Sequence, residues 1–85
     1  MARVLLTSAA QRDYKRLPRE VQQAVQKLFD GDFPADPLGP QFNVRKVQEP
    51  FTGYRLRLGH YRVLFELEPD MIIVYRVRHR KDAYR

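Results

Sequence analysis

The sequence contains no cysteine and no tryptophan, and it has only two histidines among its 85 residues. The absence of cysteine excludes a disulfide framework and a thiolate zinc site. The two histidines, His60 and His79, fall in separate predicted elements and are a poor start for any other metal centre. We therefore expect neither a metal ion nor another cofactor.

Long apolar runs are also missing. No segment reaches the roughly 18 apolar residues that a membrane helix needs, and the first residues, MARVLLTSAAQRDYKR, turn polar too early for a secretory signal. With 44% hydrophobic and 31% charged residues, the chain predicts one compact domain over residues 1–85. We expect it to act in the cytoplasm, without a membrane partner.

Positive charge is what the sequence has in excess. The formal net charge is +6, and arginine supplies 12 of the 16 basic residues. Residues 54–85 hold eight basic and four acidic residues, whereas residues 1–53 hold eight and six. Arginine forks onto phosphate and stacks on bases, so an anionic partner, most simply nucleic acid, is favoured on the C-terminal half. The alternative is a basic surface with no partner.

The first half of the chain predicts one strand and two helices. Residues 3–7 form a short apolar run, and Ser8 is a candidate cap for a helix that begins at Ala9 and ends at Leu17-Pro18. Residues 18–31 have apolar residues at i, i+3, i+4, i+7 and i+8, with Gly31 as the stop. Residues 30–43 contain three prolines and two glycines, which predicts a loop.

From Val44 onward the apolar pattern has a period of two, which is typical of strands. The predicted strands are residues 44–47, 53–58, 61–67 and 71–77, with turns at Glu49-Pro50, Gly59-His60 and Glu68-Pro69-Asp70. A strand and two helices followed by consecutive strands predict an α+β fold, in which a mostly antiparallel sheet carries both helices on one face.

A two-residue turn at Gly59-His60 fixes which side chains share a face of that sheet. It pairs Leu58 with Tyr61 and Arg57 with Arg62. The predicted core face carries Tyr54, Leu56, Leu58, Tyr61, Val63, Phe65, Leu67, Ile73, Tyr75 and Val77. The predicted opposite face carries Arg55, Arg57, Arg62, Glu66, Arg76, Arg78 and, if the last strand continues that far, Arg80. Like charges directly across a sheet cost roughly 0.2 to 1 kcal/mol a pair, so we expect an anionic ligand on this face.

Three sequence segments carry a resemblance to a known family. They are Lys15-Arg16-Leu17-Pro18, the block YRLRLGHYRVLF from Tyr54 to Phe65, and the closing HRKDAY from His79 to Tyr84. The chain resembles the RelE/ParE superfamily of toxins, and more particularly its RelE-type members. The resemblance implies a metal-independent endoribonuclease that cleaves messenger RNA in the ribosomal A site through attack of a ribose 2′-hydroxyl, thereby inhibiting translation, and that a cognate RelB-like antitoxin silences.

The resemblance also implies residue roles. Arg62 would bind the scissile phosphate, Arg80 would stabilise developing charge, and Tyr84 would stack on or orient a base. Arg55 and Arg57 stand where some relatives carry lysine. Since arginine does not lose its proton, these two are better electrostatic clamps than bases.

The general base is left open by the sequence. Glu66 and His79 are candidates, and His60 is a weaker one. The competing interpretation of Glu66 is that it relieves repulsion among the arginines, and that of His79 is a structural role. Possible RNA contacts are Lys46, Arg76, Arg78 and Lys81. Plain solvated surface is the competing interpretation for these four residues.

Two further functions remain as alternatives. One is a ParE-like inhibitor of DNA gyrase, although such members generally lack the set of Arg62, Arg80 and Tyr84. The other is a catalytically inactive relative that only binds its antitoxin. In every case the antitoxin should present acidic residues and an amphipathic helix or an added strand.

Overall fold

The computed structural model describes residues 3–47 and 53–82 of the chain. Its elements, in chain order, are β1 (Arg3–Leu6), α1 (Ser8–Arg16), α2 (Arg19–Asp30), β2 (Val44–Val47), β3 (Gly53–Leu58), β4 (Tyr61–Glu68) and β5 (Met71–His79). All the predicted strands and helices are present. Neither of the two helices in the described ranges is long and apolar enough to cross a membrane. The predicted turn at Glu49-Pro50 lies outside the described residues.

A side-chain cap begins α1, and a proline separates α1 from α2. The cap of α1 is Thr7, and the expectation that Ser8 would cap this helix is wrong. The Oγ1 atom of Thr7 accepts a hydrogen bond from the Ala10 N–H at 3.2 Å, and it donates to the carbonyl of Tyr75 at 3.2 Å. Thr7 therefore satisfies one of the free N–H groups of the helix and fixes it to β5 at the same time. At the other end Pro18 separates α1 from α2.

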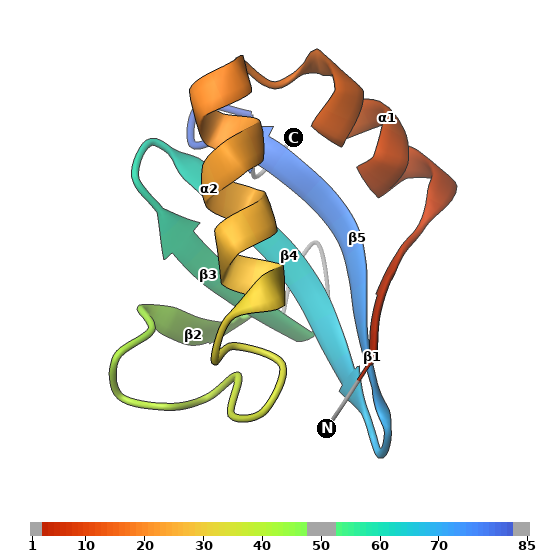
Figure 1. Ribbon diagram of the computed structural model, residues 1–85, viewed down its shortest axis with the longest axis vertical. Coiled ribbons are helices and arrows are strands. Elements are labelled where there is room, and N and C mark those ends of the chain that lie inside the picture. Colours follow the sequence, from red (N-terminus) through yellow and green to blue (C-terminus); the bar gives the residue numbers. More distant parts are fainter. Residues whose placement is uncertain (1–2, 48–52, 83–85) are drawn as a thin grey trace.

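The five strands form one sheet in the order β1-β5-β4-β3-β2. Strand β1 is parallel to β5, and the other neighbours are antiparallel. In Figure 1, α2 crosses in front of β3 and β4, and α1 lies beside β5. The buried residues Ala10 of α1 and Val25 of α2 belong to the same core as the inner side chains of the sheet. This is the predicted α+β fold, with both helices on one face and the other face uncovered by them.

The hairpin between β3 and β4 has the predicted register. Leu58 faces Tyr61 and Arg57 faces Arg62, with Gly59-His60 as the two-residue turn. Gly59 has a φ of 61°, while no described residue other than glycine has a positive φ. These signs match a type II′ turn, in which glycine takes the first central position. The register puts Leu56, Val63 and Phe65 in the core.

A β-bulge makes part of the predicted core wrong. Leu64 faces Arg76, but the next residue of β4, Phe65, faces Val74, so Tyr75 is an extra residue in β5. One extra residue reverses the alternation of side chains beyond it. Consequently Val77 is buried as predicted, whereas Ile72 and Val74 are buried in place of Ile73 and Tyr75. Burial and the nearby Glu66 carboxylate raise the pKa of the half-buried Tyr75.

The loop between α2 and β2 supplies the centre of the core. Phe33 is fully buried, and its ring meets the rings of Phe42 and Phe65 edge-on, each at a centroid distance of 5.3 Å. Such aromatic pairs are favourable beyond their buried area. The segment that leads into β2 is therefore held against the sheet despite its prolines and glycines.

Candidate functional site

A small polar pocket lies on the uncovered face of the sheet, and we call it the arginine pocket. Its volume is about 240 Å³, and its described lining residues are Asn43, Arg45, Arg55, Arg57 and Arg62. Asn43 precedes β2, and the arginines come from β2, β3 and β4. The pocket is thus built from three adjacent antiparallel strands, and no acidic residue is among the described residues that line it.

Strand register brings the four arginines together in two facing pairs. Arg45 of β2 lies opposite Arg55 of β3, and Arg57 of β3 lies opposite Arg62 of β4. The backbone N–H of Arg57 donates to the Asn43 carbonyl at 2.8 Å, which extends the β2–β3 contact past the end of the strand. The three predicted arginines, Arg55, Arg57 and Arg62, therefore do line one site.

The Arg62 side chain is held in place by the backbone of the hairpin turn. Its Nη1 atom donates to the carbonyl of Gly59 at 3.1 Å and to the carbonyl of Tyr61 at 2.9 Å. These bonds orient the guanidinium through Nη1, one of its three nitrogen atoms. A pre-oriented cation needs little reorganisation when an anion binds.

Positive charge is crowded at this site. The pKa of Arg62 lies below the ordinary value for arginine, first because of burial and then because of neighbouring positive charges, which belong to Arg57, Arg55 and Arg80. Arg80 reaches this neighbourhood because its backbone N–H donates to the carbonyl of His60 in the turn at 2.7 Å. An anion in the pocket would relieve this repulsion, and a phosphate matches the forked donors of arginine.

The sequence analysis did not predict two of the residues that line the arginine pocket, Asn43 and Arg45. The predicted phosphate contact on this strand was Lys46, which lies opposite Tyr54 in the β2–β3 register. Tyr54 packs against the core, so Lys46 belongs to the other face of the sheet and does not line the arginine pocket. The alternation of side chains in VRKV would have identified Arg45 as a residue of the arginine side if the pairing of β2 with β3 had been known.

Arg76 is engaged in an ion pair away from the pocket. Its Nε and Nη2 atoms donate to the Asp13 carboxylate of α1 at 2.8 and 3.1 Å, and the Val77 N–H donates to the same carboxylate at 3.0 Å. Arg76 therefore joins α1 to β5, and the structure does not bring it into the pocket. Arg78 lies opposite Arg62 across β4 and β5.

Of the closing segment from His79 to Tyr84, the structure describes the residues up to Asp82. His79 lies opposite Tyr61 on the helix side of the sheet, as its parity predicts, and its ring stacks on that of His60 at a centroid distance of 6.3 Å. Its Nδ1 atom accepts a hydrogen bond from the backbone N–H of Lys81 at 3.2 Å. His79 is thus on the wrong side of the sheet to act as a base at the arginine pocket. Tyr84 lies outside the described residues.

Glu66 is on the arginine side of β4, two residues beyond Leu64, which faces Arg55. It is four residues from Arg62, which corresponds to about 13 Å at roughly 3.3 Å per residue. It is not among the residues that line the pocket, and its charge acts instead on Tyr75. Within the described ranges no group of three or more histidine or acidic residues is arranged to hold a metal ion.

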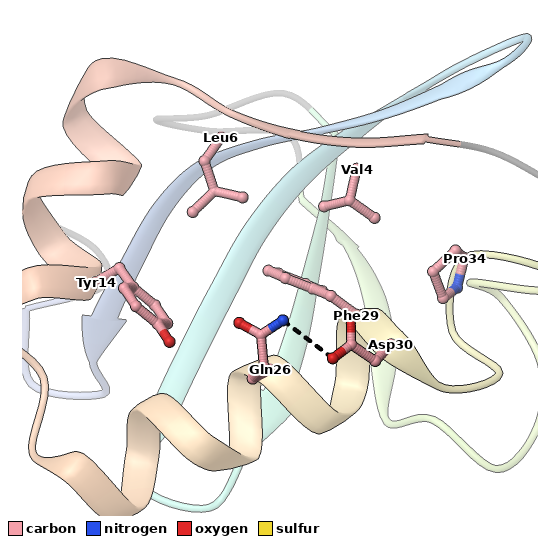
Figure 2. Close-up of a pocket in the computed structure, with 7 residues that line it drawn as sticks. All are labelled: Val4, Leu6, Tyr14, Gln26, Phe29, Asp30 and Pro34. Atoms are coloured by element: carbon pink, nitrogen blue, oxygen red, sulfur yellow. Dashed lines mark hydrogen bonds between the residues drawn. The ribbon is translucent and has the colours of Figure 1, made fainter.

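A second hollow lies on the helix side, between β1 and α2. It has a volume of about 410 Å³ and is lined by Val4, Leu6, Tyr14, Gln26, Phe29, Asp30 and Pro34. Figure 2 shows the apolar side chains of β1 facing Phe29, with Gln26 and Asp30 joined by a hydrogen bond of 3.0 Å along α2. This apolar groove suits a protein segment better than a charged ligand.

Comparison with known proteins identifies the family. Residues 4–84 match the family model described as the ParE toxin of the type II toxin-antitoxin system parDE. The chain is 32% identical over 84 residues to toxin RelG of Mycobacterium tuberculosis and 28% identical over 83 residues to toxin RelE3 of Methanocaldococcus jannaschii, with 96% of this chain and 94% of each relative covered. A solved RelB-RelE antitoxin-toxin complex from Methanococcus jannaschii matches with a TM-score of 0.78 at 26% identity, covering 94% of both chains. The chain therefore belongs to the RelE/ParE superfamily of type II toxin-antitoxin toxins.

Proposed function

We propose that this toxin is a ribosome-dependent endoribonuclease that cuts messenger RNA in the A site and thereby inhibits translation. The observation that carries the proposal is the convergence of Arg45, Arg55, Arg57 and Arg62 on one pocket whose described lining contains no acid. The similarity to toxin RelE3 and toxin RelG supports the choice of a RelE-type activity within the superfamily. An action on ribosomes places the site of action in the cytoplasm.

The proposed chemistry is attack of a ribose 2′-oxygen on the adjacent phosphate. The phosphorane that forms gains negative charge, and donors already aimed at that charge lower the barrier. In this scheme Arg62, oriented by two backbone carbonyls, binds the scissile phosphate, while Arg55 and Arg57 hold it from β3. Arg80 neutralises charge that develops as the 5′-oxygen leaves. Arg78 and Lys81 contact RNA outside the pocket.

Electrostatic stabilisation is the main contribution of the pocket in this scheme. Neither base candidate is placed to take the 2′-hydroxyl proton beside Arg62, since Glu66 is about 13 Å along the strand and His79 faces the helices. Crowded guanidinium groups instead favour the ionised form of a bound hydroxyl. In this scheme the 2′-hydroxyl proton passes to solvent water, and the leaving 5′-oxygen takes a proton from solvent water. The departure from lysine at Arg55 and Arg57 thus replaces possible bases with permanent cations.

A cognate antitoxin is the proposed partner. The matched solved structure contains a RelB antitoxin with its toxin. An acidic antitoxin segment would neutralise the arginine face and compete with RNA, and an amphipathic helix would fit the apolar groove between β1 and α2. β1 is also an edge strand, available for an added strand.

Gyrase inhibition is the second candidate, because the matching family model is that of ParE toxins. Primer extension on a defined messenger RNA in a translating extract separates the two. We expect cuts only when ribosomes are present, lost with Arg62→Ala and retained with Arg3→Ala, which removes an exposed arginine from the far edge of the sheet. Intact RNA in every lane, together with inhibition of purified gyrase, would establish the ParE-like activity instead.

A further inference from the structure

The type of the turn between β3 and β4 is not explained by the fold alone. Gly59 has a φ of 61°, and no described residue other than glycine has a positive φ, which makes Gly59-His60 a type II′ turn. A type I′ turn would give the same two-residue connection and the same register. Packing does not require glycine either, because no atom of the described residues, chain neighbours aside, lies within 4 Å of where a Gly59 Cβ would stand. The choice of turn therefore needs another reason.

The two turn types differ in the direction of the peptide group between the central residues. In type I′ this peptide is rotated by about half a turn relative to type II′, so its carbonyl points to the opposite side of the hairpin. In this chain that carbonyl belongs to Gly59, and it accepts a hydrogen bond from Arg62 Nη1 at 3.1 Å. The second acceptor of Nη1, the Tyr61 carbonyl at 2.9 Å, belongs to β4 and not to the turn.

Arg62 needs such acceptors because it stands among like charges. Arg57 faces it across the hairpin, and the charges of Arg57 and Arg80 act on its guanidinium. An arginine side chain has many rotamers, and repulsion favours those that move the guanidinium away from its neighbours. The two carbonyl oxygens attract the cation and hold it against that repulsion. The same turn also fixes the backbone of Arg80, whose N–H donates to the His60 carbonyl at 2.7 Å.

We propose that Gly59 is a positioning residue for Arg62: its positive φ selects the type II′ turn, and this turn aims the Gly59 carbonyl at Nη1. A rotamer that is fixed in advance does not have to be ordered when a phosphate binds, and it keeps the cation in place as charge develops. The effect on catalysis rests on the proposed ribonuclease function, whereas the orientation of Arg62 does not.

The test uses two variants of the full chain that differ in turn type. His60→Ser gives a Gly-Ser turn, which keeps glycine at the first position and with it type II′. Gly59→Asn combined with His60→Gly gives an Asn-Gly turn, which favours type I′ and keeps the two-residue loop. Both variants lack the imidazole of His60 and have the same net charge. Their comparison therefore isolates the direction of the central carbonyl.

The first measurement is the rate of messenger RNA cleavage on programmed ribosomes. We expect the rate to be about tenfold lower with the Asn-Gly turn than with the Gly-Ser turn, which is the effect of one lost hydrogen bond. In an Arg62→Ala background the two turns should give equal rates, because Gly59 acts through Arg62. Equal rates with Arg62 in place, or a difference that persists without it, would overturn the proposal.

The second measurement needs neither ribosomes nor cleavage. Hydrogen bonds on Nη1 slow the rotation of that group, so nuclear magnetic resonance should show separate Nη signals for Arg62 in the wild-type chain and the Gly-Ser variant, and averaged signals in the Asn-Gly variant. Identical Arg62 spectra in the two variants would contradict the positioning role. Separate signals in a wild-type chain that cuts no RNA would contradict only the proposed ribonuclease activity. Urea denaturation checks the fold, and the Asn-Gly variant should be no less stable than the Gly-Ser variant.

Discussion

The two faces of the same sheet contribute to the stability of the fold with opposite signs. On the helix face, Leu56, Val63 and Phe65 are buried side by side, and the burial of these apolar side chains stabilises the fold. On the other face, Arg55, Arg57 and Arg62 alternate with those residues and repel one another. The comparison teaches that the helix face specifies the fold, while the arginine face costs stability and fits the anionic ligand that we propose for it.

The largest expected effect comes from the helix face. Phe33→Ala should lower the free energy of unfolding by about 3 to 5 kcal/mol, because it leaves a cavity where the ring meets Phe42 and Phe65. Urea denaturation measures this loss. Phe33→Leu is the control and should cost much less, since it keeps most of the apolar volume. A loss below about 1 kcal/mol for Phe33→Ala would mean that the loop is not part of the core.

The next effect is on activity rather than stability. Arg62→Ala should lower the rate of messenger RNA cleavage by about 10² to 10³-fold, the range found when one oriented charge-stabilising donor is removed. Single-turnover cleavage on programmed ribosomes gives the rate, and urea denaturation should show no comparable loss of stability. A loss of stability as severe as the loss of rate would contradict the conclusion that the arginine face serves activity rather than stability.

A smaller effect is expected where the two faces meet at α1. Asp13→Ala should cost about 1 to 3 kcal/mol, because it leaves the Arg76 guanidinium and the Val77 N–H without their acceptor. Glu20→Ala removes an exposed carboxylate from α2 and serves as the control. In a double-mutant cycle, Asp13→Ala with Arg76→Ala should cost less than the two single changes together. Additive costs would show that the ion pair contributes nothing.

The smallest effect should have the opposite sign. Arg57→Gln should raise stability by about 0.2 to 1 kcal/mol, because it removes one of two like charges that face each other across β3 and β4. The gain should shrink when salt is added, since salt screens the repulsion. Adding Arg62→Ala to this variant should bring little further gain in stability. A loss of stability would indicate that the guanidinium groups pack favourably even without an anion.

The fold was largely predictable because its strongest determinants are local. Gly59 fixes a two-residue turn, and the turn fixes the register of β3 and β4 and hence the side of every arginine on them. The bulge at Tyr75 was not predictable, since two routes along β5 bury apolar residues almost equally well and only packing against β4 selects between them.

Only the site residues that lie on the β3–β4 hairpin were predictable from the sequence. Arg55, Arg57 and Arg62 follow from the β3–β4 register, whereas Arg45 and Asn43 enter through β2, whose pairing depends on a separate connection. Arg76 shows that being on the correct face of a strand is not enough to bring a side chain into the pocket. Its parity is right for the arginine face, but a carboxylate on α1, 63 residues earlier in the chain, binds its guanidinium.

The parallel pairing of β1 with β5 has a consequence for synthesis on the ribosome. Arg3 lies opposite Met71, so the first strand made must wait for the last strand before it can enter the sheet. A contact between such distant parts of the chain closes late in folding, since a long loop must first be ordered. α1 is also fixed through Thr7 and Asp13 to that same last strand. The sheet therefore gains β1, and α1 gains its contacts with β5, only after β5 itself has been synthesised.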